Sequence, residues 1–304
     1  MIFLLLSIPI RRATMKKINI IGAGKAGSTL AIIFNKNPEI RLGAICDYDP
    51  TKLSVLYDKI NADDFITSAG CLPDADIHLI TTPDDLIIST CDEIIKSQLI
   101  KTKSIFAHCS GTIASSSLCD AVNNEHLVAS VHPVKSFASP EHAAKTFSGT
   151  YCGFEGDYEA VDLLKSIFAR AGAYCFDIDP EKKSLYHAAA VLSCNYLNTL
   201  IELGITTYGK AGVNREIASN IIETIAKDTL CNIFNSSPSA ALTGPISRGD
   251  VLTITKHLDA FVEEGDEQLL AAYKLLGLKT VALAREQGNT DKESLDKINE
   301  ILGV

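Results

Sequence analysis

From Lys16 onward, short apolar segments alternate with longer segments whose apolar residues recur at helical spacing. The expected strands are INIIG, RLGAICDYD, FIT, DIHLITTP, SIFAHCS and LVASVHP, and the expected helices cover about residues 25–36, 51–60, 84–97 and 113–121. Two further strands, TYCGFEG and AYCFDID, flank a helix over about residues 159–171. Strands that alternate with helices in this way form a parallel sheet with helices on both faces.

The pattern changes after Asp179, which is placed to cap a helix that opens with Pro180. Beyond it the sequence predicts only helices, over residues 181–209, 214–235, 250–263, 266–287 and 291–302. A chain of 304 residues is longer than one usual domain. We therefore expect an α/β fold, with a doubly wound parallel sheet over residues 15–180 and an all-helical domain over residues 181–304.

The first 14 residues need a separate interpretation. IFLLLSIPI is apolar, but it lacks a charged segment before it, is about half the length that spans a bilayer, and is followed by Arg11 and Arg12. We expect an upstream start codon, with Met15 beginning the natural protein and residues 1–14 non-native or disordered. The alternative is a real extension that contacts a membrane or a partner.

Charge and cysteine content narrow the class of protein. The formal net charge is -9, and Lys and Arg are scattered, whereas a nucleic-acid surface needs clustered positive charge. The nine cysteines show no CxxC spacing, which is typical of reduced, packed thiols in the cytoplasm. We expect small-molecule partners, no nucleic acid, no membrane and no metal site.

GAGKAG, residues 22–27, directly follows the first expected strand and opens the first expected helix. Glycines there allow a tight turn and the close approach of backbone N–H groups to a pyrophosphate, which the positive end of the helix also attracts. Asp47 ends the second strand about twenty residues further on, where a carboxylate binds the ribose hydroxyls of a dinucleotide. The alternative is that the glycines only tighten the turn.

Asp47 also bears on the choice of cofactor, because a carboxylate there repels a 2′-phosphate. The sequence favours NAD, although Lys52 and a rotated loop would admit NADP. TTPDD, residues 81–85, follows the fourth strand at the same sheet edge, where a turn with Asp84 as a helix cap explains it equally well. The expected cofactor contacts are Gly22, Gly24, Lys25, Ala26, Gly27, Asp47, Thr81, Thr82 and Pro83.

Two more strands end in polar, turn-forming groups, HCSG at residues 108–111 and HPVKS at residues 132–136. Both are expected at the edge that carries the glycine loop, so they converge on the nicotinamide end of a bound cofactor. We assign Ser110 to the substrate and His132 to catalysis, while a histidine after a strand can also be structural.

The helix EKKSLYHAAAVLSCNYLNTL, residues 181–200, carries a polar stripe. At about 100° per residue, His187, Asn195 and Asn198 fall on one side, with Lys183 one turn upstream. The stripe faces water, pairs within a core or lines a pocket, and we expect one of the last two because the flanking apolar residues look buried. In a pocket, His187 acts as acid or base, the two asparagines orient the substrate, and Lys183 holds an acidic group, unless it is a solvated first-turn residue.

ALTGPISRGD, residues 241–250, is predicted to be a rigid loop between two helices, with Asp250 as the cap of the second. Arg248 is placed to clamp a carboxylate or phosphate in bidentate fashion, or equally to bind a helix end.

These motifs together resemble the Rossmann-like proteins that carry a DUF2520 domain, distant relatives of pyrroline-5-carboxylate reductase and prephenate dehydrogenase. The resemblance covers about residues 15–287 and rests on IGAGKAG, HCSG, HPVKSF, YHAAAVLSCNYL and ALTGPISRGD in this order. It implies an NAD(P)-binding amino-terminal domain and a helical domain through which two chains form a homodimer. It also implies that the last loop lies near the substrate, which supports Thr243, Gly244 and Arg248 as substrate contacts.

One departure from related β-hydroxyacid dehydrogenases matters. Those proteins use a lysine with an asparagine one turn later, whereas here His187 is followed one turn later by Val191. Their mechanism does not transfer directly to this chain.

We therefore expect a cytoplasmic NAD(P)-dependent oxidoreductase. It would transfer hydride to or from the C=O or C=N group of a small, anionic metabolite held between the domains. The alternatives are a non-catalytic NAD(P)-binding sensor or regulatory dimer, and a reductase that uses deazaflavin, against which Asp47 argues.

Overall fold

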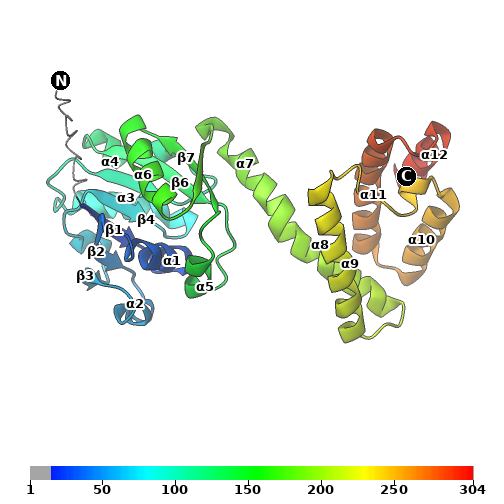
Figure 1. Cartoon of the computed structure of the whole chain (residues 1–304), viewed down its shortest axis with the longest axis horizontal. Coiled ribbons are helices and arrows are strands. Elements are labelled where there is room, and N and C mark those ends of the chain that lie inside the picture. Colours follow the sequence, from blue (N-terminus) through cyan, green and yellow to red (C-terminus); the bar gives the residue numbers. More distant parts are fainter. Residues whose placement is uncertain (1–14, 304) are drawn as a thin grey trace, which may run out of the picture. The chain divides into compact units, whose positions relative to one another are not determined.

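The computed structural model of the chain describes residues 15–303, so the expectations for residues 1–14 lie outside the described residues. The chain divides into two compact units between Val191 and Leu192 (Figure 1). Strands end before residue 180, but the first helix after that point still belongs to the N-terminal unit.

The N-terminal unit contains one eight-stranded sheet with the order β3-β2-β1-β4-β5-β6-β7-β8. Its strands are β1 (Lys16–Ile21), β2 (Ile40–Cys46), β3 (Ala62–Ile66), β4 (Ile77–Ile80), β5 (Ile105–His108), β6 (Leu127–Pro133), β7 (Tyr151–Gly156) and β8 (Tyr174–Asp177). The first six strands are parallel, and the strand order reverses beside β1, as in dinucleotide-binding sheets.

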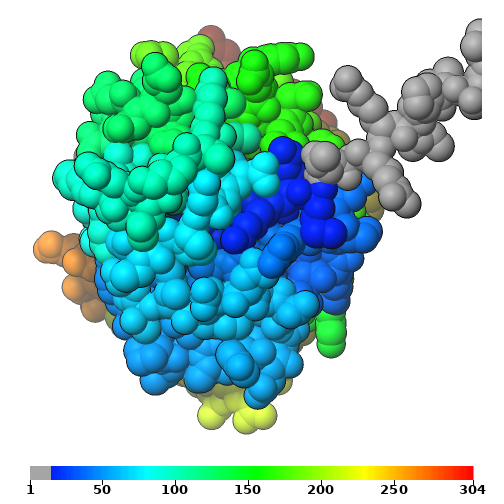
Figure 2. Space-filling view, turned by 90° about the vertical axis from the view of Figure 1, so that its left-hand side faces the viewer, coloured from blue at the N-terminus to red at the C-terminus, as the bar shows by residue number. Residues whose placement is uncertain are grey.

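The helices of this unit are α1 (Lys25–Phe34), α2 (Pro50–Tyr57), α3 (Ile87–Lys96), α4 (Cys119–Asn123), α5 (Pro140–Lys145), α6 (Tyr158–Arg170) and α7 (Lys183–Ala190). They are joined by short 3₁₀ turns η1 (Ala69–Cys71), η2 (Asp84–Leu86), η3 (Ser115–Ser117) and η4 (Pro180–Lys182). Figure 2 shows one face of this unit, on which blue, cyan and green segments from distant parts of the sequence form one continuous surface.

Both faces of the sheet are buried. Ile18 and Ile20 point into one apolar cluster, in which Phe34 also lies, whereas Ile21 belongs to a second cluster with Phe106. Successive side chains of a strand point to opposite faces, so β1 contributes to both clusters. Strands that are buried on both faces are expected to be largely apolar, and INIIG fits this except at Asn19, whose buried amide donates to the Pro73 carbonyl at 2.7 Å and accepts from the Ala44 N–H at 2.8 Å.

The last two strands differ from a fully parallel sheet. β7 runs antiparallel to β6, and β8 runs parallel to β7. The connection between β6 and β7 begins and ends at the same edge of the sheet, because the Val134 N–H, just after β6, donates to the carbonyl of Tyr151, the first residue of β7, at 2.8 Å. β7 must therefore run in the direction opposite to β6. This connection contains α5, a helix that the sequence pattern did not indicate.

The C-terminal unit is helical. A π-helical turn, η5 (Val191–Asn195), leads into α8 (Tyr196–Lys210), α9 (Arg215–Asn235), η6 (Ile246–Arg248), α10 (Val251–Glu264), α11 (Glu267–Gln287) and α12 (Lys292–Gly303). The predicted cap is confirmed, because the Asp250 carboxylate accepts from the Thr253 N–H at 3.0 Å. The predicted fold class, a doubly wound sheet followed by helices, is therefore confirmed.

The helical run Pro180–Lys210 stands out by its exposed apolar side chains. By length and composition it is the one helix among residues 15–303 that could cross a membrane, with only 6% of its most apolar window buried. Leu185 is 74% exposed, and Leu192 and Tyr196 are exposed as well. A single helix of this kind is weak evidence for a membrane span, and exposed apolar side chains are also typical of a protein interface.

Candidate active site

The glycine loop between β1 and α1 is shaped by close backbone contacts. Gly22 has φ of +106°, a conformation that side chains other than glycine rarely adopt. A Cβ atom on Gly27 would lie 1.9 Å from the Gly22 carbonyl oxygen, so this position has no room for a side chain. A Cβ atom on Gly24, by contrast, would meet nothing within 4 Å. The loop is therefore tight on the protein side and open on the other.

The start of α1 supplies hydrogen-bond donors to this open side. The helix begins at Lys25, and its N-cap residue, Gly24, has no side chain that could accept from the first N–H groups. The first N–H groups of a helix, here those of Lys25, Ala26 and Gly27, have no acceptor within the helix, and the helix dipole favours negative charge there. The loop is thus open to a pyrophosphate, and its binding there stays a prediction.

Asp47 lies at the end of β2 with a well-defined set of donors. Its Oδ2 accepts from the Ala23 N–H at 2.8 Å, and its Oδ1 accepts from the Asp49 N–H at 2.9 Å. The Lys52 ammonium lies 3.3 Å from both oxygens. The carboxylate therefore fixes the glycine loop, and Lys52 adds positive charge where the ribose of a dinucleotide would lie.

The TTPDD segment supports the loop from β4. The Thr81 hydroxyl donates to the Gly22 carbonyl at 2.7 Å, while the Thr82 hydroxyl oxygen is buried and has no partner among residues 15–303. Of the two interpretations of this segment, the one in which Asp84 caps a helix is wrong, since the N-cap positions of η2 and α3 are Pro83 and Leu86. Asp84 is the first residue of η2, and its Oδ2 accepts instead from Ser110 Oγ at 2.7 Å and from Thr112 Oγ1 at 2.8 Å.

Ser110 lies in the loop that follows β5, and its side chain is buried. Besides donating to Asp84, its hydroxyl oxygen accepts from the Thr112 N–H at 3.1 Å and from the Ile113 N–H at 3.0 Å. Through these bonds the Ser110 hydroxyl connects the loop after β5 with Asp84, which follows β4. In this structure Ser110 therefore acts on the site through Asp84 and the loop backbone.

His132 and His187 come together against Gly111. The ring centroids of the two histidines are 5.7 Å apart. A Cβ atom on Gly111 would lie 2.5 Å from His187 Cδ2 and 2.9 Å from His132 Nε2, so the backbone of the HCSG loop packs directly against both rings. The two strand ends that were expected to converge, HCSG and HPVKS, do meet, and the helix that carries His187 joins them within the N-terminal unit.

Tyr186 completes this group and was missed by the sequence analysis. Its hydroxyl lies 2.8 Å from His132 Nδ1, and the two rings are nearly perpendicular, at 86°. Burial, with the nearby His187 and Lys183, lowers the pKa of His132 to about 4, against an opposite effect of Asp84. Burial raises the pKa of Tyr186 to about 12. Both side chains are neutral near pH 7.

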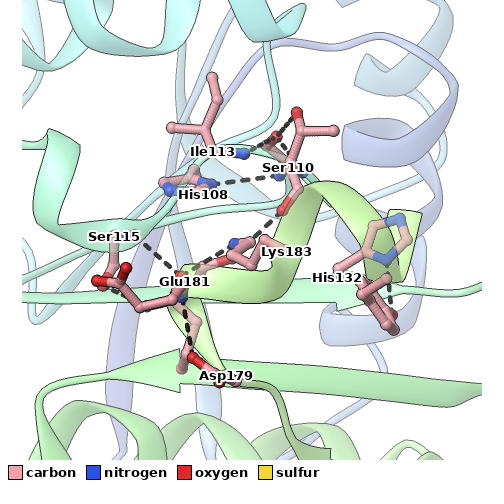
Figure 3. A network of polar contacts seen from close by, with 12 residues as sticks. His108, Ser110, Ile113, Ser115, His132, Asp179, Glu181 and Lys183 are labelled. Atoms are coloured by element: carbon pink, nitrogen blue, oxygen red, sulfur yellow. Dashed lines mark hydrogen bonds and ion pairs between the residues drawn. The ribbon is translucent and has the colours of Figure 1, made fainter. Parts of the chain in front are cut away.

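Lys183 does not face a substrate, which corrects the two roles considered from the sequence. Its side chain is 1% exposed, and its ammonium donates to Glu155 Oε1 at 2.9 Å and to Ser130 Oγ at 2.5 Å. Figure 3 shows Lys183 reaching from its helix into a network that also holds His108, Ser110 and Ser115. Lys183 is an internal cation that binds α7 to β6 and β7.

Asn195 and Asn198 are exposed and belong to the C-terminal unit, so the structure does not group them with His187. The predicted stripe assumed an uninterrupted α-helix, but Val191–Asn195 is π-helical, and its wider turn changes the angle between residues before and after it. The Asn198 amide donates to the Cys194 carbonyl at 3.1 Å.

The loop ALTGPISRGD is held rigidly within the C-terminal unit. Gly244 and Gly249 have positive φ, and the Gln287 amide donates to the Leu242 carbonyl at 2.9 Å. Thr243 and Arg248 are exposed on this loop, and no ion pair to Arg248 is found in the part of the chain that the structure describes. The guanidinium is available to a ligand.

The fold and these loops define a class: a dinucleotide-binding α/β sheet followed by a helical unit. Residues 150–280 match the family model described as Domain of unknown function (DUF2520), which confirms the predicted resemblance. No curated protein matches the chain.

Solved structures share the fold over nearly the whole chain. The protein TM1727 from Thermotoga maritima has a TM-score of 0.65 and 22% identity, and the match covers 94% of this chain and 100% of that one. The putative NADP oxidoreductase BF3122 from Bacteroides fragilis has a TM-score of 0.68 and 20% identity, with 90% and 97% covered. The Plasmodium falciparum pyrroline carboxylate reductase, solved with NADP bound, has a TM-score of 0.53 and 15% identity, with 95% and 100% covered.

Proposed function

We propose that this protein is an NAD(P)-dependent oxidoreductase that acts on the C=O or C=N group of a small metabolite, or on the corresponding alcohol or amine. The observation that carries the proposal is the placement of two features at one sheet edge. The open glycine loop follows β1, and the His132–His187 pair meets the loop that follows β5, so both lie at the carboxyl ends of parallel strands. Ligands of such sheets bind at that edge. The names of the Bacteroides and Plasmodium proteins, which mention NADP, agree with this.

The residues of this chain have distinct tasks in the proposed reaction. A bound nicotinamide supplies or accepts the hydride. The N–H groups at the start of α1 bind the pyrophosphate, and Asp47 shapes the loop and contacts the ribose. His187, whose ring is half-buried, gives a proton to the substrate oxygen or nitrogen in reduction and removes it in oxidation.

The remaining substrate contacts are proposed in the C-terminal unit. Thr243, Gly244 and Arg248 lie on its rigid loop, and Arg248 suits an anionic group of the substrate. Asn195 and Asn198 are exposed and keep their proposed role in orienting the substrate. Alanine variants of Arg248 and of Asn195 should raise KM for the substrate. An unchanged KM would contradict the proposed substrate contact of the residue that was replaced.

We also propose a cytoplasmic homodimer. The nine cysteines form no disulfide among the described residues, which agrees with a reducing compartment. The exposed apolar side chains of Pro180–Lys210, among them Leu192 and Tyr196, supply the surface that a second chain would bury. Sedimentation of the purified protein tests the dimer directly.

Calorimetric titration with NAD(H) and NADP(H), followed by a screen of metabolite oxidation and reduction, tests the function, and a His187→Ala variant tests the mechanism. We expect this variant to keep the cofactor affinity and to lose about 10²- to 10⁴-fold in turnover, because it removes the proton-transferring group. Unchanged turnover would remove His187 from catalysis. Cofactor binding without any turnover of the wild-type protein would favour the sensor alternative.

Gly111→Ala tests the close packing of the loop against the two imidazoles. The new methyl group would lie 2.5 Å from His187 and 2.9 Å from His132, so both rings must move by several tenths of an ångström. We expect turnover to fall by at least about tenfold with the cofactor affinity unchanged, since geometry near the reacting atoms controls the rate. Gly209→Ala, where a Cβ meets nothing within 4 Å, is the matched control. Equal turnover of the two variants would contradict the proposed site.

A further inference from the structure

The hydrogen bond between Tyr186 and His132 has two possible directions, because the donor and acceptor roles of a histidine nitrogen depend on its tautomer. The phenol oxygen and His132 Nδ1 are 2.8 Å apart, and this is the one hydrogen bond of the Tyr186 hydroxyl within residues 15–303. If Nδ1 carried a hydrogen atom, the phenol would accept it and its own O–H group would have no acceptor. If instead the hydroxyl donates to Nδ1, the phenol hydrogen has its acceptor within the protein, and the imidazole hydrogen is left to bind a ligand.

Donation by the Tyr186 hydroxyl would fix the tautomer of His132. A neutral imidazole carries one hydrogen atom, so an accepting Nδ1 places that atom on Nε2. A Cβ atom on Gly111 would lie 2.9 Å from His132 Nε2 and 2.5 Å from His187 Cδ2. His132 Nε2 therefore lies beside the backbone of the HCSG loop and beside His187. No hydrogen bond to Nε2 is found in the described part of the chain.

We propose that Tyr186 is a positioning residue that holds His132 as a neutral imidazole with its hydrogen on Nε2, and that this N–H group donates a hydrogen bond to the reacting oxygen or nitrogen of the substrate. His132 polarises the C=O or C=N bond and keeps its own hydrogen atom, while His187 transfers the proton. The two histidines thus have different tasks. Only the hydrogen bond to the substrate rests on the proposed function, since the tautomer of His132 exists without a substrate.

The register of α7 against β6 supports the proposal. Lys183 contacts Ser130, and Tyr186, three residues further along the helix, contacts His132, two residues further along the strand. Residues two apart on a strand share a face, and residues three apart on a helix lie on one side. The helix therefore runs along β6 toward the carboxyl edge of the sheet, and the buried Lys183–Glu155 pair sets where Tyr186 meets His132.

The tautomer is measurable by nitrogen NMR of the full chain labelled with ¹⁵N-histidine, with the His132 signals assigned from a His132→Gln variant. We expect the wild-type protein to show His132 neutral and protonated on Nε2 at pH 7. Tyr186→Phe keeps the ring but removes the donor, so the spectrum should change to a mixture of both tautomers. In the same variant kcat should fall by about tenfold, with little change in the cofactor Kd.

The chain contains a matched control. His257 Nδ1 and the Tyr273 hydroxyl are 2.7 Å apart with rings at 84°, which repeats the geometry in the C-terminal unit. Tyr273→Phe should change only the His257 signals and leave turnover as it is.

Two results would overturn the proposal: a His132 hydrogen atom on Nδ1 in the wild-type protein, or a Tyr186→Phe variant with unchanged His132 signals and unchanged kcat. Failure of the proposed function would show itself differently, as the absence of cofactor binding in calorimetry, because the NMR measurement needs neither cofactor nor turnover.

Discussion

Replacing Gly24 by valine is expected to weaken the binding of NAD(H) and NADP(H) by at least about 100-fold while the protein remains folded. The position tolerates a side chain, since a Cβ atom meets nothing within 4 Å and the backbone is extended, with φ of -69°. The added isopropyl group occupies the space that the pyrophosphate needs. Hydrogen bonds to charged groups contribute about 1.5–3 kcal/mol each, so the loss of two of them corresponds to about 100-fold or more in Kd.

Two further glycine variants separate this effect from general damage. Gly209→Val adds the same group at another open position, in α8, and should leave cofactor binding unchanged. Gly27→Ala should instead destabilise the N-terminal unit, because its methyl group would overlap the Gly22 carbonyl oxygen. Calorimetry measures the affinities and circular dichroism checks the folding. A Gly24→Val protein that binds either cofactor with wild-type affinity would show that the loop is not the cradle.

The glycine loop between β1 and α1 was predictable because its signals are local. Glycine spacing, the apolar strand before it and the helix after it lie within about 20 residues, and strand and helix periodicities fix which side chains face the sheet. The antiparallel turn to β7 was not predictable in this way, since it depends on a connection that stays at one edge of the sheet.

The environment of Lys183 shows where sequence reasoning ended. Its position in the first turn of a helix fits a solvated residue, a ligand or an internal ion pair equally well, and the choice depends on Glu155, which lies 28 residues earlier in a strand. Tyr186 was overlooked for the same reason, because its role appears only once α7 is aligned with β6. The stripe through Asn195 failed at a π-helical turn for which no composition rule gives warning.

The buried pair also gives the largest expected change in stability. Lys183→Met leaves the Glu155 carboxylate, 5% exposed, without its cation, and Glu155→Gln leaves the Lys183 ammonium without its counter-charge. Breaking a buried pair by removing one partner costs about 3–5 kcal/mol. We expect each single variant to lose that much stability in the N-terminal unit, measured by hydrogen exchange of peptides from β6, β7 and α7.

The double variant Lys183→Met with Glu155→Leu is the informative control, because neither charge then remains buried. Its loss should be smaller than the sum of the two single losses, by an interaction of about 1–3 kcal/mol. Strictly additive losses would mean that the two groups do not act as a pair. Arg215→Met at the exposed Glu202–Arg215 pair should leave the stability nearly unchanged, because solvent screens an exposed ion pair.

The Lys183–Glu155 pair also makes the stability of the N-terminal unit depend on pH in the acid range. Burial alone would raise the pKa of Glu155, but hydrogen bonds from Lys183 and from the Ser115 hydroxyl and N–H lower it below the ordinary glutamate value. Desolvation also lowers the pKa of Lys183, which works against the pair, so we base the pH argument on Glu155 with its three donors. Because the folded pKa lies below the unfolded one, the contribution is complete above about pH 4.5 and is lost as the pH falls through the folded value. Hydrogen exchange of the wild-type protein should therefore quicken on acidification, relative to the intrinsic rate, more than in the double variant. An equal change in both proteins would place the acid sensitivity at another group.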